Sequence, residues 1–159
     1  MLGFLDRRKE TPRLGTLRQM ALFSTLSRSE LRVVDGRLPD RTFLKDEIVF
    51  DQGEEGQALH VVITGSVLIC RQGEPETGRL TQIGPGGMFG ELALLSENAP
   101  RALQARAAED CVLASLSRGD LETLLETHAV IASKILLEFT RHLGRLLVER
   151  SSWADPKTP

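Results

Sequence analysis

The fold of this chain is decided by residues 84–102, which read GPGGMFGELALLSENAPRA. A glycine-rich loop leads into residues 91–95, which contain good helix formers and no β-branched residue, so a single helical turn is expected there. The first N–H groups of a helix lack intrahelical partners and attract anions. Pro100 stiffens the chain before Arg101, whose guanidinium can hold a phosphate through two N–H groups. The stretch therefore predicts an anion-binding site.

Glu91 is the exception in this stretch, because a carboxylate beside a phosphate site repels the ligand. It fits if the carboxylate accepts a hydrogen bond from a ribose hydroxyl and also pairs with a cation. A cyclic nucleotide offers this combination of an anion and a neighbouring hydroxyl. The alternative is that Glu91 and Arg101 form an ordinary surface ion pair, worth about 0 to 1 kcal/mol. The position of the stretch, late in a strand-rich region with two helices after it, favours the binding site.

The flanking sequence changes its hydrophobic period twice. Residues 16–38 carry apolar side chains at helical spacing, and Ser27 followed by Glu30 has the spacing of a capping box. Residues 42–117 consist of short apolar runs between glycine-rich turns, which is typical of strands. The helical period returns at residue 118 and continues to residue 150.

These patterns predict an α+β fold built on an antiparallel, jelly-roll-like β-roll of about eight strands. N-terminal helices precede the roll, a short helix lies within it and two C-terminal helices follow it. We expect one folded domain at residues 16–150, with flexible tails at residues 1–15 and 151–159.

Residues 89–102 resemble the phosphate-binding cassette of the cyclic nucleotide-binding domain family. The upstream residues 53–67, GEEGQALHVVITGSV, resemble the paired-glycine hairpin of the same family. That family includes the catabolite activator protein, the regulatory subunits of protein kinase A and cyclic nucleotide-gated channels. The resemblance covers residues 16–150, and the two motifs stand in the right order.

The resemblance implies a role for each matching residue of the cassette. Glu91 would bind the ribose 2′-hydroxyl, with the backbone of Gly90 and Leu92 beside it. Arg101 would bind the cyclic phosphate, helped by the backbone N–H of Ala102. A Thr or Ser after the arginine often favours cGMP in this family, so Ala102 favours cAMP as the ligand, with cGMP or a cyclic dinucleotide as alternatives.

The resemblance also implies that the final helix closes over the base. Three side chains on or after this helix are candidates for the base lid: Arg141, Arg145 and Trp153. The apolar stripe of the helix could also pair with a second copy of the chain, giving a homodimer. His60 stands where the family often has Tyr, and we expect it to have a packing role.

Composition excludes several other classes of protein. A net charge of −2 over 159 residues argues against nucleic-acid binding by this chain. No apolar stretch approaches the length of a membrane span. Cys70 and Cys111 are expected to be reduced, buried thiols. A cytoplasmic protein is therefore expected. The three histidines lack metal-ligand spacing, and no nucleophile–base pair is present. Neither an enzyme nor a cofactor is therefore expected.

Two functions remain open at this level. The first is a cyclic nucleotide sensor whose C-terminal helix moves on binding and signals to an effector protein or to a second copy. The second is a degenerate member of the same fold that serves as a ligand-independent docking or oligomerisation module. Too few residues follow the final helix to form a recognition helix, so we expect a stand-alone sensor or a domain of a longer chain. Retention of both Glu91 and Arg101 favours the sensor, because an empty roll needs neither.

Overall fold

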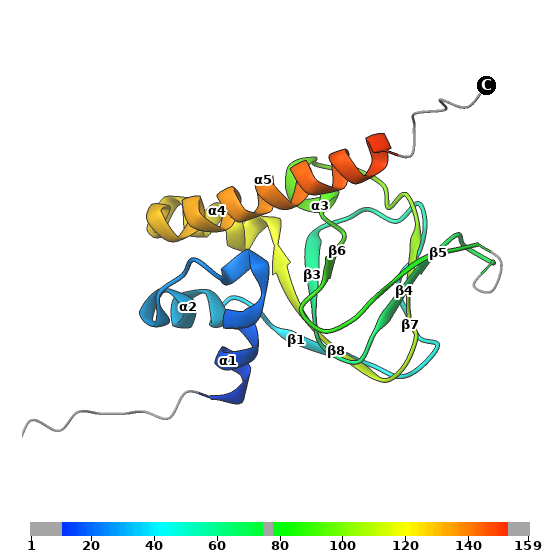
Figure 1. Ribbon diagram of the computed structural model, residues 1–159, viewed down its shortest axis with the longest axis horizontal. Coiled ribbons are helices and arrows are strands. Elements are labelled where there is room, and N and C mark those ends of the chain that lie inside the picture. Colours follow the sequence, from blue (N-terminus) through cyan, green and yellow to red (C-terminus); the bar gives the residue numbers. More distant parts are fainter. Residues whose placement is uncertain (1–10, 75–77, 153–159) are drawn as a thin grey trace, which may run out of the picture.

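Two four-stranded antiparallel sheets form the centre of the protein, in a computed structural model that describes residues 11–74 and 78–152. Figure 1 shows them facing one another as a roll, with the helices gathered at one end and along one side. One sheet has the order β1-β8-β3-β6 and comprises Asp40–Phe43, Cys111–Ser117, Ala58–Thr64 and Met88–Phe89. The other has the order β2-β7-β4-β5 and comprises Ile48–Phe50, Gln104–Ala107, Val67–Cys70 and Arg79–Ile83. The predicted β-roll is confirmed.

The N-terminal helical region consists of three short elements. They are α1 (Pro12–Gln19), the 3₁₀ turn η1 (Ala21–Phe23) and α2 (Arg28–Asp35). Helix α1 begins before the expected start at residue 16, because the side chain of Thr11 accepts a hydrogen bond from the N–H of Leu14. Helix α2 has the predicted capping box, in which Ser27 and Glu30 each accept the other's backbone N–H.

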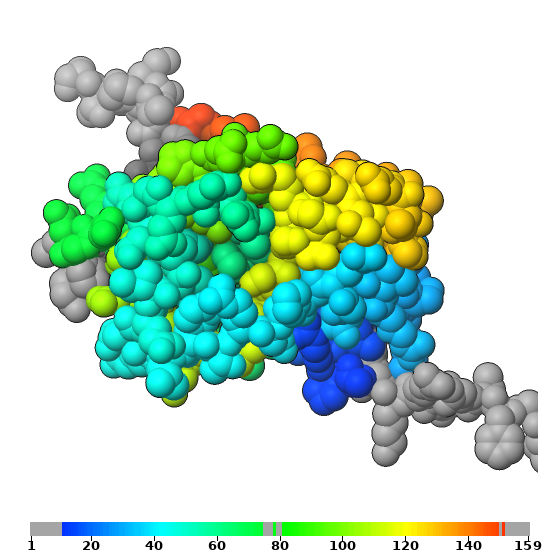
Figure 2. Space-filling model, turned by 180° about the vertical axis from the view of Figure 1, so that it is seen from behind, coloured from blue at the N-terminus to red at the C-terminus, as the bar shows by residue number. Residues whose placement is uncertain are grey.

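Two helices follow the roll, as the sequence predicts. Helix α4 (Arg118–Thr127) begins at Ser117, whose hydroxyl accepts the N–H of Asp120. Helix α5 (Ala129–Ser152) is the longest helix and runs from α4 back across α3 (Leu92–Leu95), the predicted short helix (Figure 1). Lys134 of α5 and Glu30 of α2 form an ion pair at 2.9 Å. The N-terminal and C-terminal helices therefore form one block beside the roll, which Figure 2 shows from behind.

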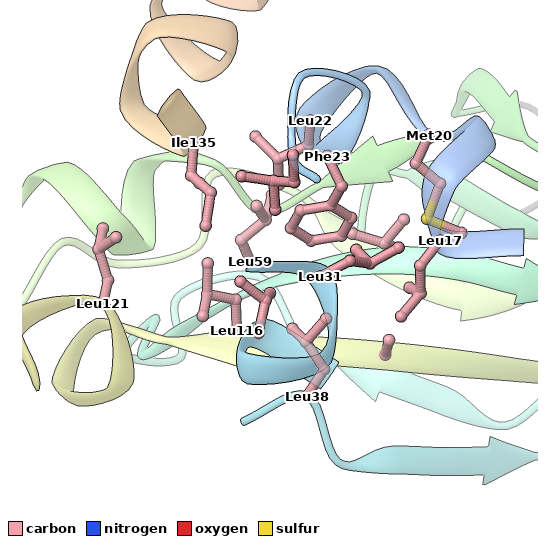
Figure 3. Close-up of a cluster of buried hydrophobic side chains, with 14 of the residues drawn as sticks. Leu17, Met20, Leu22, Phe23, Leu31, Leu38, Leu59, Leu116, Leu121 and Ile135 are labelled. Carbon is pink, nitrogen blue, oxygen red and sulfur yellow. The ribbon is translucent and has the colours of Figure 1, made fainter. Parts of the chain in front are cut away.

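Strand alternation divides the apolar side chains of the roll between two cores. Leu59 and Val61 of β3 point away from the roll and pack in a cluster with the helices, while Val62 belongs to a second cluster inside the roll. Figure 3 shows the first cluster, where Phe23 and Leu31 from the N-terminal helices meet Leu59 and Leu116. His60 lies on the same face of β3 as Val62. The first cluster thus holds the helices against the sheet, and the cluster inside the roll positions the site.

No helix in the described part of the chain combines the length and the hydropathy that a membrane crossing needs.

Cys70 and Cys111 are both free and buried, and burial raises the pKa of each thiol above its ordinary value.

Candidate functional site

The guanidinium of Arg101 forms the centre of the candidate site. Its Nη1 donates to the carbonyl of Gly90 at 3.0 Å and its Nη2 donates to the carbonyl of Ala58 at 2.9 Å. Its Cζ lies 4.0 Å from the centroid of the Phe50 ring, a cation–π distance. Burial lowers the pKa of Arg101 from its ordinary value, and the charges of Glu54 and Glu91 oppose that shift. The arginine is therefore a half-buried cation whose two hydrogen-bond acceptors in the structure are neutral carbonyls.

The Nε–H group of Arg101 is buried and has no hydrogen-bond partner among the described residues. Leaving a buried charged donor unpaired costs more than leaving a neutral one, about 1 to 3 kcal/mol or above. A phosphate oxygen is an acceptor that this edge of a guanidinium binds well. The arginine therefore has donor capacity that the protein itself does not use.

Pairing between two distant loops holds Arg101 in place. The N–H of Arg101 donates to the carbonyl of Glu54 at 2.7 Å, and its own carbonyl accepts the N–H of Gly53 at 2.8 Å. A third bond joins the N–H of Gly56 to the carbonyl of Ala99 at 3.1 Å. The two segments that carried the family resemblance are therefore in contact and fix the backbone under the arginine.

Two glycines make room for the guanidinium. A Cβ added at Gly90 would lie 2.6 Å from Nη1 of Arg101, and the φ of Gly90 is +79°, which L side chains rarely adopt. A Cβ added at Gly56 would lie 3.1 Å from Cζ of Arg101 and 3.0 Å from the Cβ of Ala93. Gly90 was predicted at the site from the sequence, and Gly56 was not.

Glu91 precedes the first turn of α3 and contacts α5. Its Oε1 lies 3.2 Å from Nε2 of His142, and the two side chains are 22% and 20% exposed. No binding role for His142 was predicted from the sequence, where the three histidines lack metal-ligand spacing. A signal for its position exists, because His142 lies seven residues after Ile135 and three after Phe139, which are both buried. His142 therefore continues the inward face of α5 at the point where that face reaches the cassette.

Arg118 is a further residue at the site that was not predicted from the sequence. At the start of α4, its guanidinium donates to the carbonyls of Ala93 at 2.8 Å, Ser96 at 2.9 Å and Gly56 at 3.2 Å. The first two carbonyls lie at the end of α3, where a helix leaves acceptors without intrahelical partners. Arg118 thus connects the C-terminal helices directly to the cassette.

His60 lies deep in the roll beside the arginine. Its ring packs between Phe50 and Phe89, at centroid distances of 5.8 and 5.3 Å, and its Nδ1 lies 2.9 Å from the hydroxyl of Ser115. Burial, followed by the charges of Arg101 and Arg41, lowers the pKa of His60 to about 4. His60 is therefore a neutral packing residue near pH 7.

The remaining predicted residues lie in different places. Leu92 is exposed on α3, and Ala102 is exposed directly after Arg101. Arg141 forms an ion pair with Glu138 on α5, and Arg145 borders a surface hollow with it. Trp153 lies outside the described residues. The structure brings together Gly90, Glu91 and Arg101, and His142 of α5 contacts Glu91.

A metal centre finds no support in the described ranges, where no group of three His, Cys, Asp or Glu side chains could hold an ion. The protein belongs to the class of ligand-binding β-roll domains. Two antiparallel sheets close into a roll, a half-buried arginine lies beside a short helix, and a long helix runs across that short helix.

Comparison with known proteins identifies the family within that class. The sequence profile described as "Cyclic nucleotide-binding domain" matches residues 40–128. The chain belongs to the cyclic nucleotide-binding domain family, and the predicted resemblance is confirmed.

Individual relatives support the same assignment. The cyclic AMP receptor protein of Thermus thermophilus is 33% identical over 125 residues, which are 77% of this chain and 56% of that protein. A cAMP-dependent protein kinase regulatory subunit of Yarrowia lipolytica is 36% identical over 104 residues, or 65% of this chain and 26% of that protein. The regulatory domain of Toxoplasma gondii PKA, solved with cAMP, superimposes with a TM-score of 0.60 at 30% identity, covering 70% of this chain and 42% of that one. The chain thus spans about half or less of the length of these relatives.

Proposed function

We propose that this protein is a cyclic nucleotide sensor that binds cAMP at Glu91 and Arg101 and signals through α5. The observation that carries the proposal is the incomplete hydrogen bonding of the Arg101 guanidinium. Its guanidinium is half-buried, its Nη atoms reach only backbone carbonyls, and its buried Nε–H is without a partner in the described chain. A cyclic phosphate supplies the missing negative charge and acceptor together.

The contacts around Arg101 support a role for each cassette residue. The carboxylate of Glu91 accepts one hydrogen bond from His142 through Oε1, which leaves acceptor capacity for a ribose 2′-hydroxyl. Backbone N–H groups at Gly90, Leu92 and Ala102 can complete the contacts to the sugar and the phosphate. Ala102 offers no hydroxyl to a guanine base, which favours cAMP over cGMP.

Signal output would pass through the helices that touch the cassette. His142 of α5 contacts Glu91, directly before α3, and Arg118 of α4 contacts α3 itself. A shift of α3 on ligand binding would therefore change the position of both helices. The outer face of α5 carries exposed apolar side chains, namely Val130, Leu137, Leu147 and Val148. This face is available to an effector or to a second copy in a homodimer.

Calorimetric titration with cAMP, cGMP and cyclic di-GMP tests the proposal. We expect cAMP to bind with a Kd of about 10 μM or tighter, with no heat in the Arg101→Ala variant. Arg32→Ala is the matched control, because Arg32 is exposed on α2 and away from the cassette. If none of the three nucleotides binds the folded protein, the sensor proposal is wrong and a ligand-independent docking module is the better account.

A further inference from the structure

The contact between Glu91 and His142 joins the ribose-binding candidate to the helix that would carry the signal. The two residues are 51 positions apart in the chain, with His142 on α5 and Glu91 directly before α3. Nε2 of His142 lies 3.2 Å from Oε1 of Glu91, and each side chain is largely shielded from solvent. An imidazole can bind a second proton, and protonation would change this contact from a neutral hydrogen bond to an ion pair.

Charged groups on α5 next to His142 contact other partners or lie at the surface. Glu138, one turn before His142, is paired with Arg141, and Lys134 is paired with Glu30 of α2. Arg145, one turn after His142, lies at a surface hollow on α5.

The elements packed against α5 add few charges near the imidazole. Arg118 of α4 donates to the carbonyls at the end of α3, and Asp120 lies 3.6 Å from Arg37. The η1 turn, Ala21–Phe23, carries no titratable side chain. Arg101 interacts electrostatically with Glu91. Within the described residues, Glu91 is therefore the charged partner at hydrogen-bond distance from His142.

We propose that His142 makes the affinity of the site pH-dependent, with the protonated imidazole favouring the bound nucleotide. The inference rests on the proposed function of the same site. An unneutralised Glu91 carboxylate repels the phosphate that Arg101 attracts. The imidazolium offsets that repulsion and keeps α5 against the cassette, while Glu91 retains its second oxygen for the ribose.

The sign of the effect follows from linkage. A nucleotide that binds the protonated form more tightly must in turn favour proton uptake at His142. Between charges this close at a partly exposed site, the coupling amounts to a factor of about three to ten in affinity. Nucleotide affinity should therefore rise by about that factor as the pH falls from 8 to 5.5, and binding should take up protons from the buffer.

The experiment measures Kd for cAMP and cGMP from pH 5.5 to 8 for the wild-type protein, His142→Gln and His128→Gln. Glutamine at position 142 can still donate to Glu91 but does not titrate. His128 follows α4 and is exposed, so its substitution is the matched control. We expect the wild-type and His128→Gln proteins to share the pH profile and His142→Gln to bind with a flat profile.

Three results would overturn the inference. They are a flat wild-type profile, a profile that survives in His142→Gln, and weaker binding at low pH, which would mean that His142 competes with the ribose for Glu91. In each of these cases nucleotide still binds, so the proposed function stands. If no nucleotide binds at any pH, both the proposed function and this inference are wrong.

Discussion

The guanidinium of Arg101 lies 4.0 Å above the ring of Phe50, and that ring in turn packs against His60 and Phe89 inside the roll. Phe50 ends a short strand of one sheet, while His60 and Phe89 belong to the other. The aromatic cluster therefore joins the two sheets beneath the arginine. Cation–π pairs are worth about 0.5 to 2 kcal/mol, the larger value applying when the pair is desolvated.

Replacing Phe50 with Leu should weaken nucleotide binding while retaining the fold. Leucine fills much of the same space but provides no aromatic face to Arg101, so the arginine loses part of its positioning. We expect cAMP affinity to fall by a factor of about 3 to 30, which corresponds to the range of a cation–π pair. Titration calorimetry of Phe50→Leu beside the wild-type protein measures this. Unchanged affinity in a folded variant would show that the ring does not position Arg101.

Replacing Gly90 with Ala should lower both stability and nucleotide affinity. The new Cβ would lie 2.6 Å from Nη1 of Arg101, and the residue would have to keep a φ of +79°. We expect a loss of about 1 to 3 kcal/mol in the free energy of unfolding. Gly15→Ala is the control, because Gly15 lies inside α1 with nothing within 4 Å of an added Cβ, so that variant should be neutral or more stable. Urea denaturation of the two variants measures the contrast, and equal stabilities would contradict the clash.

His60 should make the protein less stable as the pH falls from 6.5 to 4. Its pKa is about 4 in the folded protein and 6.5 when unfolded, so in this range the unfolded chain binds a proton that the folded chain does not. The contribution of His60 is fully present above pH 6.5 and declines by about 3 kcal/mol at pH 4. His60→Phe retains the ring packing and removes the titration. Urea denaturation between pH 7 and 4 should therefore give a steeper loss for the wild-type protein, and parallel slopes would contradict the prediction.

Local signals in the sequence predicted much of this fold. The capping box at Ser27 and Glu30 and the short helix after Gly90 depend on neighbouring residues, and both are present. The contacts that complete the site join segments far apart in the chain. Gly56 reaches Arg101 because the 53–56 loop pairs with residues 99–101, and the sequence does not state that pairing.

The sequence alone also did not predict which side chain of α5 contacts the cassette. Adjacent helical positions differ by about 100° around the axis. Arg141 therefore points to Glu138 along α5, while His142 meets the cassette. The buried positions of Ile135 and Phe139 decide which of the two faces inward, and their burial follows from the packing of α5 on η1 and α4. Charge alone favours the arginines as lid cations, whereas the side chain of α5 that contacts Glu91 is a histidine on the inward face.

Arg118 offers a test of whether the C-terminal helices respond to the cassette. Its guanidinium donates to carbonyls of Ala93, Ser96 and Gly56, so Arg118→Ala should remove about 2 kcal/mol from the free energy of unfolding and lower Tm by about 4 to 8 °C. Lysine at this position can serve one of the carbonyls but not the set, so Arg118→Lys should be intermediate. Thermal unfolding with and without saturating cAMP measures both effects. If Arg118 couples α4 to α3, the stabilisation by cAMP should be smaller in Arg118→Ala than in Arg32→Ala. An equal increase in Tm on ligand binding in these two variants would mean that Arg118 stabilises the fold without transmitting the ligand's effect.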